Sequence, residues 1–245
     1  MIEGEKKFKC LAPIGKNKAG KYIEMCYDAM RQLIDNKYVI GSESEKDFIY
    51  ERNLLISLAY LLGREHHDKV KPCYLIGGEV NKYVFDKTFQ NDDTAYDNTW
   101  INSTKSKLDF DSTYVTPDFL IHRFKKLSDK NRGGQKLVVE AKSKKSVSQK
   151  DFQKDLFKLN VYLTRLKFEK AVYIILNLRK NAIESMVYDY ISNGMFWSDK
   201  SYDKLYFLIQ ENEVSKIRTY KVGNNLYELA LKNYKKNDRY ACKQN

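Results

Sequence analysis

The feature that most constrains the fold is an apolar run at residues 171–176, which follows an amphipathic stretch. A run without charged residues suits a strand that is buried on both faces of a sheet. Upstream, large apolar residues recur at helical spacings of four, three, four and three, namely Phe152, Leu156, Leu159, Leu163 and Leu166. A strand that precedes this helix would complete a right-handed crossover between parallel strands. The order predicts an α/β fold with a central mixed β-sheet flanked by helices on both faces.

A β-hairpin is predicted before that helix, from residues 116–124 and 135–142. Both segments are rich in β-branched and aromatic residues, and turn formers at 128–134 separate them. Folding the chain about residue 130 sets Asp118 opposite Lys142. Glu140 shares a strand face with Lys142, because side chains two residues apart point the same way. We therefore expect these three charged side chains to converge at one end of the hairpin.

Two carboxylates and a lysine at a strand end can bind a divalent cation and a phosphate. Magnesium takes one or two carboxylates together with water and substrate phosphate, and a lysine can stabilise phosphate charge or help to activate water. Each motif also has an ordinary interpretation, since an Asp after Pro is often a turn residue and Glu-x-Lys is often a solvated charge pair. A strand with Val138 and Val139 in the core, however, should not turn Glu140 inwards without compensation.

Pro117-Asp118 followed by Glu140-Ala141-Lys142 resembles the signature of the PD-(D/E)xK nuclease superfamily, which includes restriction endonucleases and DNA-repair nucleases. The order of helix, strands, Glu-x-Lys strand, helix and strand over residues 42–177 resembles the common core of that superfamily. The resemblance implies a restriction-endonuclease-like fold and a Mg²⁺- or Mn²⁺-dependent endonuclease. Asp118, Glu140 and the Ala141 carbonyl would bind the metal, and Lys142 would act on the attacking water and the phosphate.

A helix is expected between Ser42 and Gly63, and it carries a carboxylate within its apolar stripe. Glu51 lies three residues after Phe48 and four before Leu55, where a buried carboxylate needs a partner. The resemblance implies an acidic residue on a helix before the core sheet, close to the metal, and we assign this catalytic and metal-binding role to Glu51. The alternative is an exposed stripe edge where Glu51 pairs with a neighbouring basic residue, with Asp47 as the next candidate.

The net charge of +12 favours a polyanionic partner, although the lysine-rich composition of an AT-rich genome would produce the same excess. Candidate DNA-phosphate contacts follow the Glu-x-Lys strand and lie on the next helix: Lys144, Lys145, Lys154, Lys158 and Arg165. An ordinary solvated helix face is the alternative. Lys158-x-x-x-Tyr162 resembles the Gln-x-x-x-Tyr element of part of the superfamily, with lysine in place of glutamine.

The length of 245 residues suits one domain. We divide it into an N-terminal helical lead-in (1–41), the nuclease-like core (42–177) and a C-terminal α/β extension of the same domain (178–245). Residues 1–19 are expected to be irregular, 21–36 helical, 69–85 a strand or hairpin, and 86–113 a long polar loop in which Trp100, Lys105 and Lys107 would suit a DNA groove. A helix is expected at 181–193 and strands at 205–210 and 217–222.

The four cysteines are scattered without a C-x-x-C motif, which favours reduced thiols in a cytoplasmic protein. No apolar run approaches the ~20 residues that span a bilayer, so no membrane partner is expected. The sequence thus predicts a DNA endonuclease, with restriction or phage defence preferred to repair, and a homodimer would supply two active sites for double-strand cleavage. The alternatives are a non-catalytic nucleic-acid-binding or assembly protein on the same scaffold, or an accidental motif on a protein that binds RNA or another protein.

Overall fold

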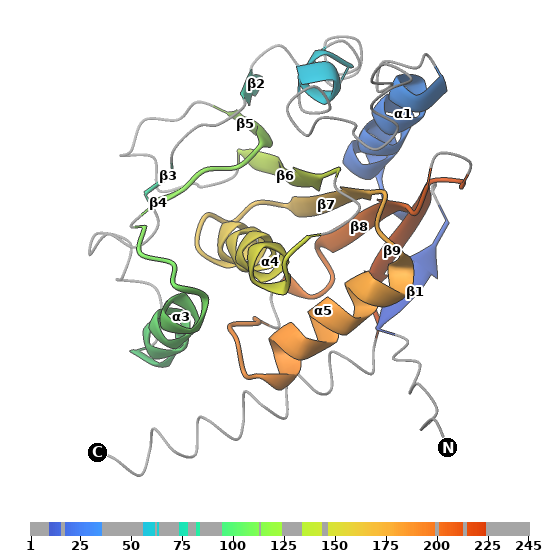
Figure 1. Cartoon of the computed structure of the whole chain (residues 1–245). Helices are drawn as coiled ribbons and strands as arrows, with labels where there is room; N and C mark the ends of the chain where they lie inside the picture. The colour runs from blue at the N-terminus through green and yellow to red at the C-terminus, as the bar shows by residue number, and fades with distance from the viewer. Residues whose placement is uncertain are drawn as a thin grey trace, which may run out of the picture.

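A seven-stranded mixed sheet forms the centre of the computed structural model (Figure 1). The structure describes residues 10–15, 18–35, 56–61, 63, 74–77, 82–83, 95–112, 114–123, 134–143, 147–198, 201–212 and 215–223. The strand order is β1-β9-β8-β7-β6-β5-β2. The strands are β1 (Leu11–Ile14), β2 (Tyr74–Gly77), β5 (Phe119–Arg123), β6 (Gln135–Lys142), β7 (Lys170–Leu176), β8 (Leu205–Gln210) and β9 (Arg218–Val222), and β3 (Lys82–Tyr83) pairs with β4 (Tyr114–Val115) in a separate ribbon.

The predicted crossover is confirmed, because β6 and β7 are parallel neighbours joined through helix α4 (Gln149–Thr164). Ser148 caps this helix, and its hydroxyl accepts a hydrogen bond from the Asp151 amide at 3.1 Å. Strand β8 continues the parallel set beside β7, while β5 and β9 run antiparallel on either side. The α/β class and the mixed sheet are therefore as expected.

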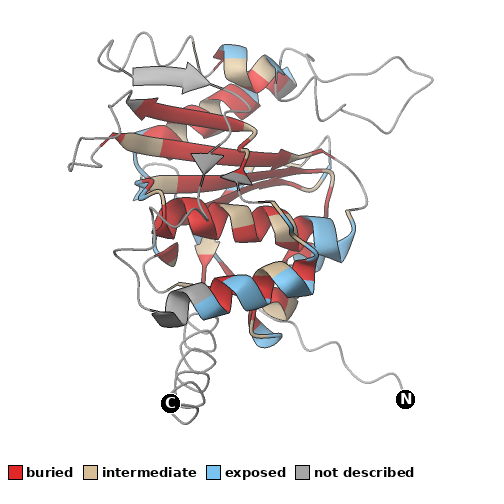
Figure 2. Ribbon diagram, turned by 90° about the vertical axis from the view of Figure 1, so that its left-hand side faces the viewer, coloured by how far each residue is buried: buried red, intermediate tan, exposed pale blue. Residues whose placement is uncertain are grey.

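Helices cover both faces of the sheet, which explains why β7 is apolar throughout (Figures 1 and 2). Ala171, Tyr173 and Ile175 pack in the core that contains α4 and α5 (Lys180–Ser192). Val172 and Ile174 pack in a second core that contains α1 (Lys21–Asp35). Alternate residues thus enter opposite cores, as the two-residue period of a strand requires.

Two predictions about local structure are wrong, and the prediction of a strand or hairpin at 69–85 is confirmed only as strands. The stretch 1–19 contains β1, which pairs antiparallel with β9 at the edge of the sheet. The expected loop at 86–113 contains helix α3 (Ala95–Leu108). Trp100 is buried in the core, and Lys107 donates a hydrogen bond to the Asn193 carbonyl at 2.8 Å. These contacts do not favour the predicted contact of either residue with a DNA groove. Strands β2 and β3 both exist, but each pairs with a different strand and they do not form a hairpin with each other.

The predicted β5–β6 hairpin exists, but its register differs. Phe119 pairs with Val139 and Leu120 with Val138, so the pairing centres on residue 129, one residue earlier than expected. A bulge between Ile121 and His122 shifts the register along the pair. Of the described helices, none is long and apolar enough to cross a membrane.

Candidate active site

A hydrogen bond between two residues of the predicted motif, Asp118 and Ala141, joins the start of β5 to the end of β6. Oδ2 of Asp118 accepts a hydrogen bond from the amide of Ala141 at 2.8 Å. This bond fixes the Asp118 carboxylate beside the strand that carries Glu140. The convergence predicted from the sequence is therefore present, and it arises through a side chain that binds the backbone of the neighbouring strand.

Strand alternation directs Glu140 and Lys142 to the same side of the sheet. Val138 belongs to the core on the α4 side, while Val139 and Ala141 belong to the opposite core. Glu140 and Lys142 accordingly reach partners on α4: Glu140 bonds to Lys158, and Lys142 to Asp155. The predicted shared face is confirmed.

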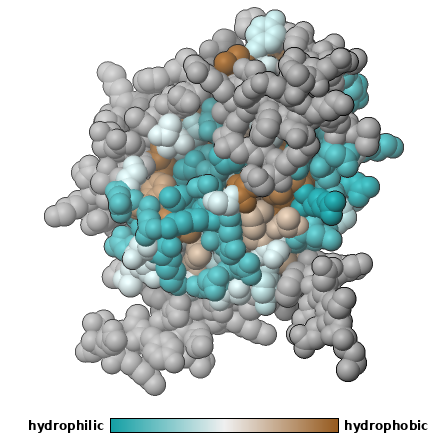
Figure 3. Space-filling model, in the orientation of Figure 1, coloured by the Kyte–Doolittle hydropathy of each residue, from teal (hydrophilic) through white to brown (hydrophobic). Residues whose placement is uncertain are grey.

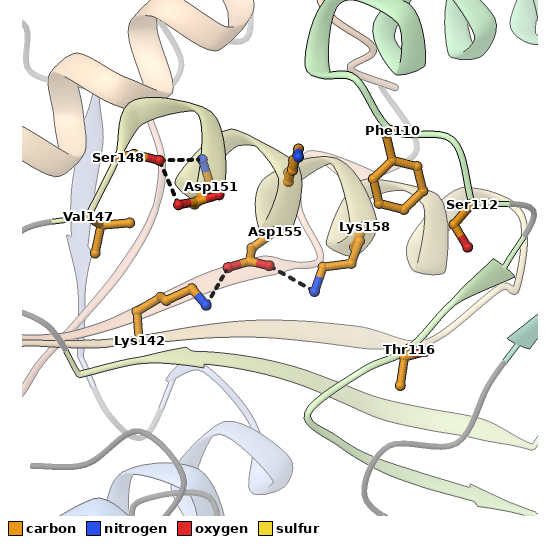
Figure 4. A pocket seen from close by; sticks show the side chains of 10 residues that line it. Phe110, Ser112, Thr116, Lys142, Val147, Ser148, Asp151, Asp155 and Lys158 are labelled. Carbon is orange, nitrogen blue, oxygen red and sulfur yellow. Dashed lines mark hydrogen bonds and ion pairs between the residues drawn. The ribbon is translucent and has the colours of Figure 1, made fainter.

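Helix α4 supplies a carboxylate and an ammonium that complete a charge network (Figure 4). Nζ of Lys158 lies 2.6 Å from Oε2 of Glu140 and 2.8 Å from Oδ1 of Asp155. The other oxygen of Asp155, Oδ2, lies 3.2 Å from Nζ of Lys142 and accepts a hydrogen bond from the Tyr173 hydroxyl at 3.2 Å. Charges therefore alternate along Glu140, Lys158, Asp155 and Lys142.

Glu140 is only 1% exposed, so its charged form loses the hydration of water and needs a partner of opposite charge. Burial raises the pKa of Glu140 well above its usual value, Lys158 opposes that rise, and Asp155 and Asp118 add to it. Burial also raises the pKa of Asp118, against the lowering effect of the Ala141 amide. Burial alone would lower the pKa of Lys158, but Glu140 and Asp155 outweigh it, so the pKa lies above the usual value and the ammonium stays charged.

Tyr162 adds a neutral hydroxyl to the same region. Burial, together with the charges of Glu140, Asp118 and Asp155, raises the pKa of its phenol. Its oxygen is buried and makes no hydrogen bond with the described residues. The carboxylates of Asp118, Glu140 and Asp155 all act on this phenol, so its hydroxyl belongs to the carboxylate cluster.

Asp118 and Glu140 fit Mg²⁺, because this ion needs only one or two carboxylate ligands from the protein. Oε1 of Glu140 is buried and has no hydrogen-bond partner in the part of the chain that the structure describes, so one carboxylate oxygen has unused coordinating capacity. No group of three histidine, cysteine, aspartate or glutamate side chains that could hold a metal occurs among the described residues. Asp118 and Glu140, with water and a phosphate oxygen, nevertheless meet the requirement of Mg²⁺ for one or two carboxylates.

An open cleft of about 540 Å³ lies beside the network. The face seen in Figure 3 carries many hydrophilic residues around the segments that contain α4 and α5. The cleft is lined by residues on either side of β4, by the end of β6, and by the first turns of α4 with the two residues before it: Phe110, Ser112, Thr116, Lys142, Val147, Ser148, Asp151, Lys154, Asp155 and Lys158. Lysine and hydroxyl donors on these walls suit a phosphate-bearing ligand.

The predicted phosphate contacts separate into three groups. Lys154 lines the cleft, as a phosphate contact should. Lys158 and Arg165 do not form a solvated face with it, because Lys158 is enclosed by carboxylates and Arg165, the residue that follows α4, is only 6% exposed. The prediction of an exposed phosphate contact is therefore wrong for Arg165. Lys144, Lys145 and Glu51, with its alternative Asp47, lie outside the described residues.

Asp155 was not among the predicted site residues, although the sequence contains a signal for it. Asp155 lies three residues after Phe152 and four before Leu159, within the apolar stripe of α4. The reasoning that selected Glu51 applies equally to this position. The contact of the Tyr173 hydroxyl with Asp155 was not predicted, because Tyr173 lies in an apolar run where a tyrosine is ordinarily a core residue.

Comparisons with protein-family models, with curated proteins and with solved structures find no match for this chain. The functional interpretation therefore depends on the geometry of the cluster and on the resemblance of its motif.

Proposed function

We propose that this chain is a Mg²⁺- or Mn²⁺-dependent DNA endonuclease with a restriction-endonuclease-like core. The observation that carries the proposal is the convergence of Asp118, Glu140 and Lys142 beside an open cleft. The buried Glu140 oxygen that lacks a hydrogen-bond partner supports a cation at this position. The parallel β6–α4–β7 unit supports the proposed core.

Asp118 and Glu140 would hold the metal, with the Ala141 carbonyl as the third ligand implied by the resemblance. When bound, a divalent ion polarises the scissile phosphate and lowers the pKa of a coordinated water. The Ala141 amide orients Asp118, and Lys158 orients Glu140. These hydrogen bonds keep two carboxylates fixed in a partly buried site where like charges would otherwise repel each other.

Lys142 is positioned to stabilise charge on the phosphate. Its ammonium lines the cleft and forms an ion pair with Asp155, which the Tyr173 hydroxyl also holds. An ammonium in such a pair donates hydrogen bonds and cannot accept a proton. We therefore assign Lys142 the electrostatic role and not that of general base.

Lys154 and the hydroxyls of Ser112, Thr116 and Ser148 line the remainder of the cleft. Cationic and hydroxyl donors of this kind contact the DNA backbone without reading its sequence. The proposed substrate is therefore DNA, bound through its phosphates. Following the resemblance, we propose restriction or phage defence as the role.

Incubation of supercoiled plasmid with the purified chain tests this proposal, with Mg²⁺, Mn²⁺ or EDTA as separate arms. We expect metal-dependent cleavage that falls by at least about 100-fold in Asp118→Asn, Glu140→Gln and Lys142→Ala. Arg31→Ala is a suitable control, because Arg31 lies on α1, on the opposite face of the sheet, and is largely exposed. Full cleavage by all three site variants would refute the assignment.

A second candidate is a non-catalytic DNA-binding or assembly protein on the same scaffold. One observation favours it: the ammonium of Lys158 already neutralises Glu140, a carboxylate that a nuclease would need for its metal. Binding of DNA that weakens with salt, without cleavage at any metal concentration, would support this candidate.

A further inference from the structure

We propose that Lys158 is an internal counterion that occupies the cation position of the carboxylate cluster, and that DNA phosphate draws it away so that a divalent ion can bind Glu140. This inference rests on the proposed function, because it concerns how that site is loaded. It adds a regulatory property, namely that metal binding and DNA binding assist each other through one lysine.

The first support is geometric. Lys158 lies within 2.8 Å of oxygens from two carboxylates that come from different elements, Glu140 on β6 and Asp155 on α4. This is the environment that a bound cation would have. The Glu140 oxygen that faces Lys158 is therefore committed to the ammonium.

The second support is the charge balance of a buried site. The side chains of Glu140, Asp155 and Lys158 are 1%, 8% and 16% exposed. Adding a divalent ion beside Glu140 while Lys158 stays in place would bring two cations together with little water to screen them. Removing the ammonium first would leave the buried Glu140 carboxylate without its counterion. Exchange of one cation for the other avoids both states.

The third support is that Lys158 also lines the cleft. Its four-carbon side chain is flexible, so its ammonium can turn towards a phosphate without a change in the helix. A DNA phosphate in the cleft would compete with Glu140 for the ammonium. By linkage, a ligand that draws Lys158 from Glu140 must strengthen metal binding, and the metal must strengthen DNA binding by the same factor.

Calorimetric titration of Ca²⁺ at about pH 8 reads metal binding independently of cleavage, because Ca²⁺ also takes carboxylate oxygens. The titration is performed on wild type, Lys158→Gln and Lys158→Arg, with and without a short DNA duplex. Glutamine keeps a donor for Glu140 but lacks the charge, so we expect its metal affinity without DNA to rise about tenfold over wild type. We also expect the enhancement of metal affinity by DNA to be at least about fivefold in wild type and clearly smaller in Lys158→Gln. Arginine keeps the charge and should resemble wild type in both respects.

Lys154→Gln provides the matched control, because Lys154 lies one turn earlier on α4 and lines the same cleft. It should weaken DNA binding and leave the affinity for Ca²⁺ alone unchanged. Equal Ca²⁺ affinities in wild type, Lys158→Gln and Lys158→Arg would overturn the inference. The inference would also be overturned if DNA raised the Ca²⁺ affinity equally in wild type and Lys158→Gln. Any direct contact between DNA and the metal contributes equally to both proteins, so this comparison isolates the effect of Lys158.

The plasmid assay separates failure of this inference from failure of the proposed function. Metal-dependent cleavage with no effect of Lys158→Gln on Ca²⁺ binding would leave the nuclease intact and remove the counterion role. Tighter Ca²⁺ binding by Lys158→Gln without cleavage in any arm would support the counterion role and refute the nuclease. Should Lys158→Gln fail to fold, wild type and Lys158→Arg still test the inference: enhancement of Ca²⁺ affinity by the DNA duplex of at least about fivefold in both proteins would support it, and Ca²⁺ affinity that the duplex leaves unchanged would overturn it.

Discussion

Lys158→Met is expected to destabilise the fold, because it removes the ammonium that lies between Glu140 and Asp155. Removing one partner of a buried ion pair typically costs about 3–5 kcal/mol. Lys142 would remain 3.2 Å from Oδ2 of Asp155, so one of the two carboxylates keeps a cationic partner. We therefore expect a loss near the lower limit, about 3 kcal/mol of unfolding free energy.

The partner variant makes this prediction sharper. Glu140→Gln keeps the shape of the side chain, and Lys158 retains Asp155 at 2.8 Å. Loss of one charge-assisted hydrogen bond should cost about 1.5–3 kcal/mol. The double variant, Lys158→Met with Glu140→Gln, has neither the ammonium at position 158 nor the carboxylate at position 140. It therefore leaves no unpaired charge at position 140. Its cost should thus be less than the sum of the single costs by about 1–3 kcal/mol.

The effect of Lys158→Met should also depend on pH. Burial raises the pKa of Glu140 above the ordinary value of 4.5, and Lys158 is the main group that opposes this rise. An acid with a raised folded-state pKa binds its proton more tightly when folded, so its ionisation lowers stability as pH rises from the unfolded pKa towards the folded one. Removing Lys158 extends that interval to higher pH. The destabilisation should therefore be largest above neutral pH and should shrink towards pH 4.5.

Urea unfolding without metal, followed by tryptophan fluorescence, measures these free energies, because Trp100 and Trp197 are both buried. Arg31→Ala serves as a control, since its exposed pair with Asp35 should contribute no more than about 0.5 kcal/mol. Additivity of the two single variants within about 0.5 kcal/mol would refute the direct interaction. Equal destabilisation by Lys158→Met at acidic and neutral pH would refute the electrostatic explanation.

Asp155→Asn should lower cleavage at least about tenfold at saturating metal, because both lysines lose the carboxylate that orients them; unchanged kcat would contradict this. Burial raises the pKa of Asp118 and Glu140, so both accept protons at a higher pH than ordinary carboxylates. Cleavage should therefore fall as pH decreases through the mildly acidic range, and added metal should restore it. A pH profile that is insensitive to metal concentration would oppose this prediction. Lys154→Ala should reduce the slope of DNA affinity against salt by about one, whereas Arg165→Ala should reduce stability without changing that slope, as salt titrations and urea unfolding would measure.

Much of the fold was predictable because its signals are local. Helical spacing on α4, the cap at Ser148 and the apolar run of β7 each depend on residues close together in the chain. Helix α3 was missed because its buried stripe is narrow and includes a polar residue. Trp100, Ile101 and Leu108 are buried with Thr104, whose hydroxyl bonds to the Trp100 carbonyl within its own helix. The Thr104 hydroxyl also accepts a hydrogen bond from the Phe196 amide, a partner far away in the chain that the sequence around α3 could not reveal.

The hairpin illustrates a second limit. The strands and the convergence of Asp118 with Glu140 were predicted correctly, but the register was not. The pair nearest the turn, His122 with Gln135, already centres between residues 128 and 129, and the bulge at Ile121 moves the centre only to residue 129. The error therefore comes from the assumed turn centre at residue 130, which a cluster of turn formers does not specify to one residue.

By itself, the sequence determined the alternation of strand and helix, the shared face of Glu140 and Lys142, and the proximity of Asp118 to them. Tertiary structure alone decided that Lys158 lies among carboxylates and not on a solvated face, and that Asp155 links the two lysines. The physical reason is that a periodic pattern specifies which direction a side chain points along its own element. Which charges it meets there, and how much water remains between them, depends on packing α4 against β6 and β7.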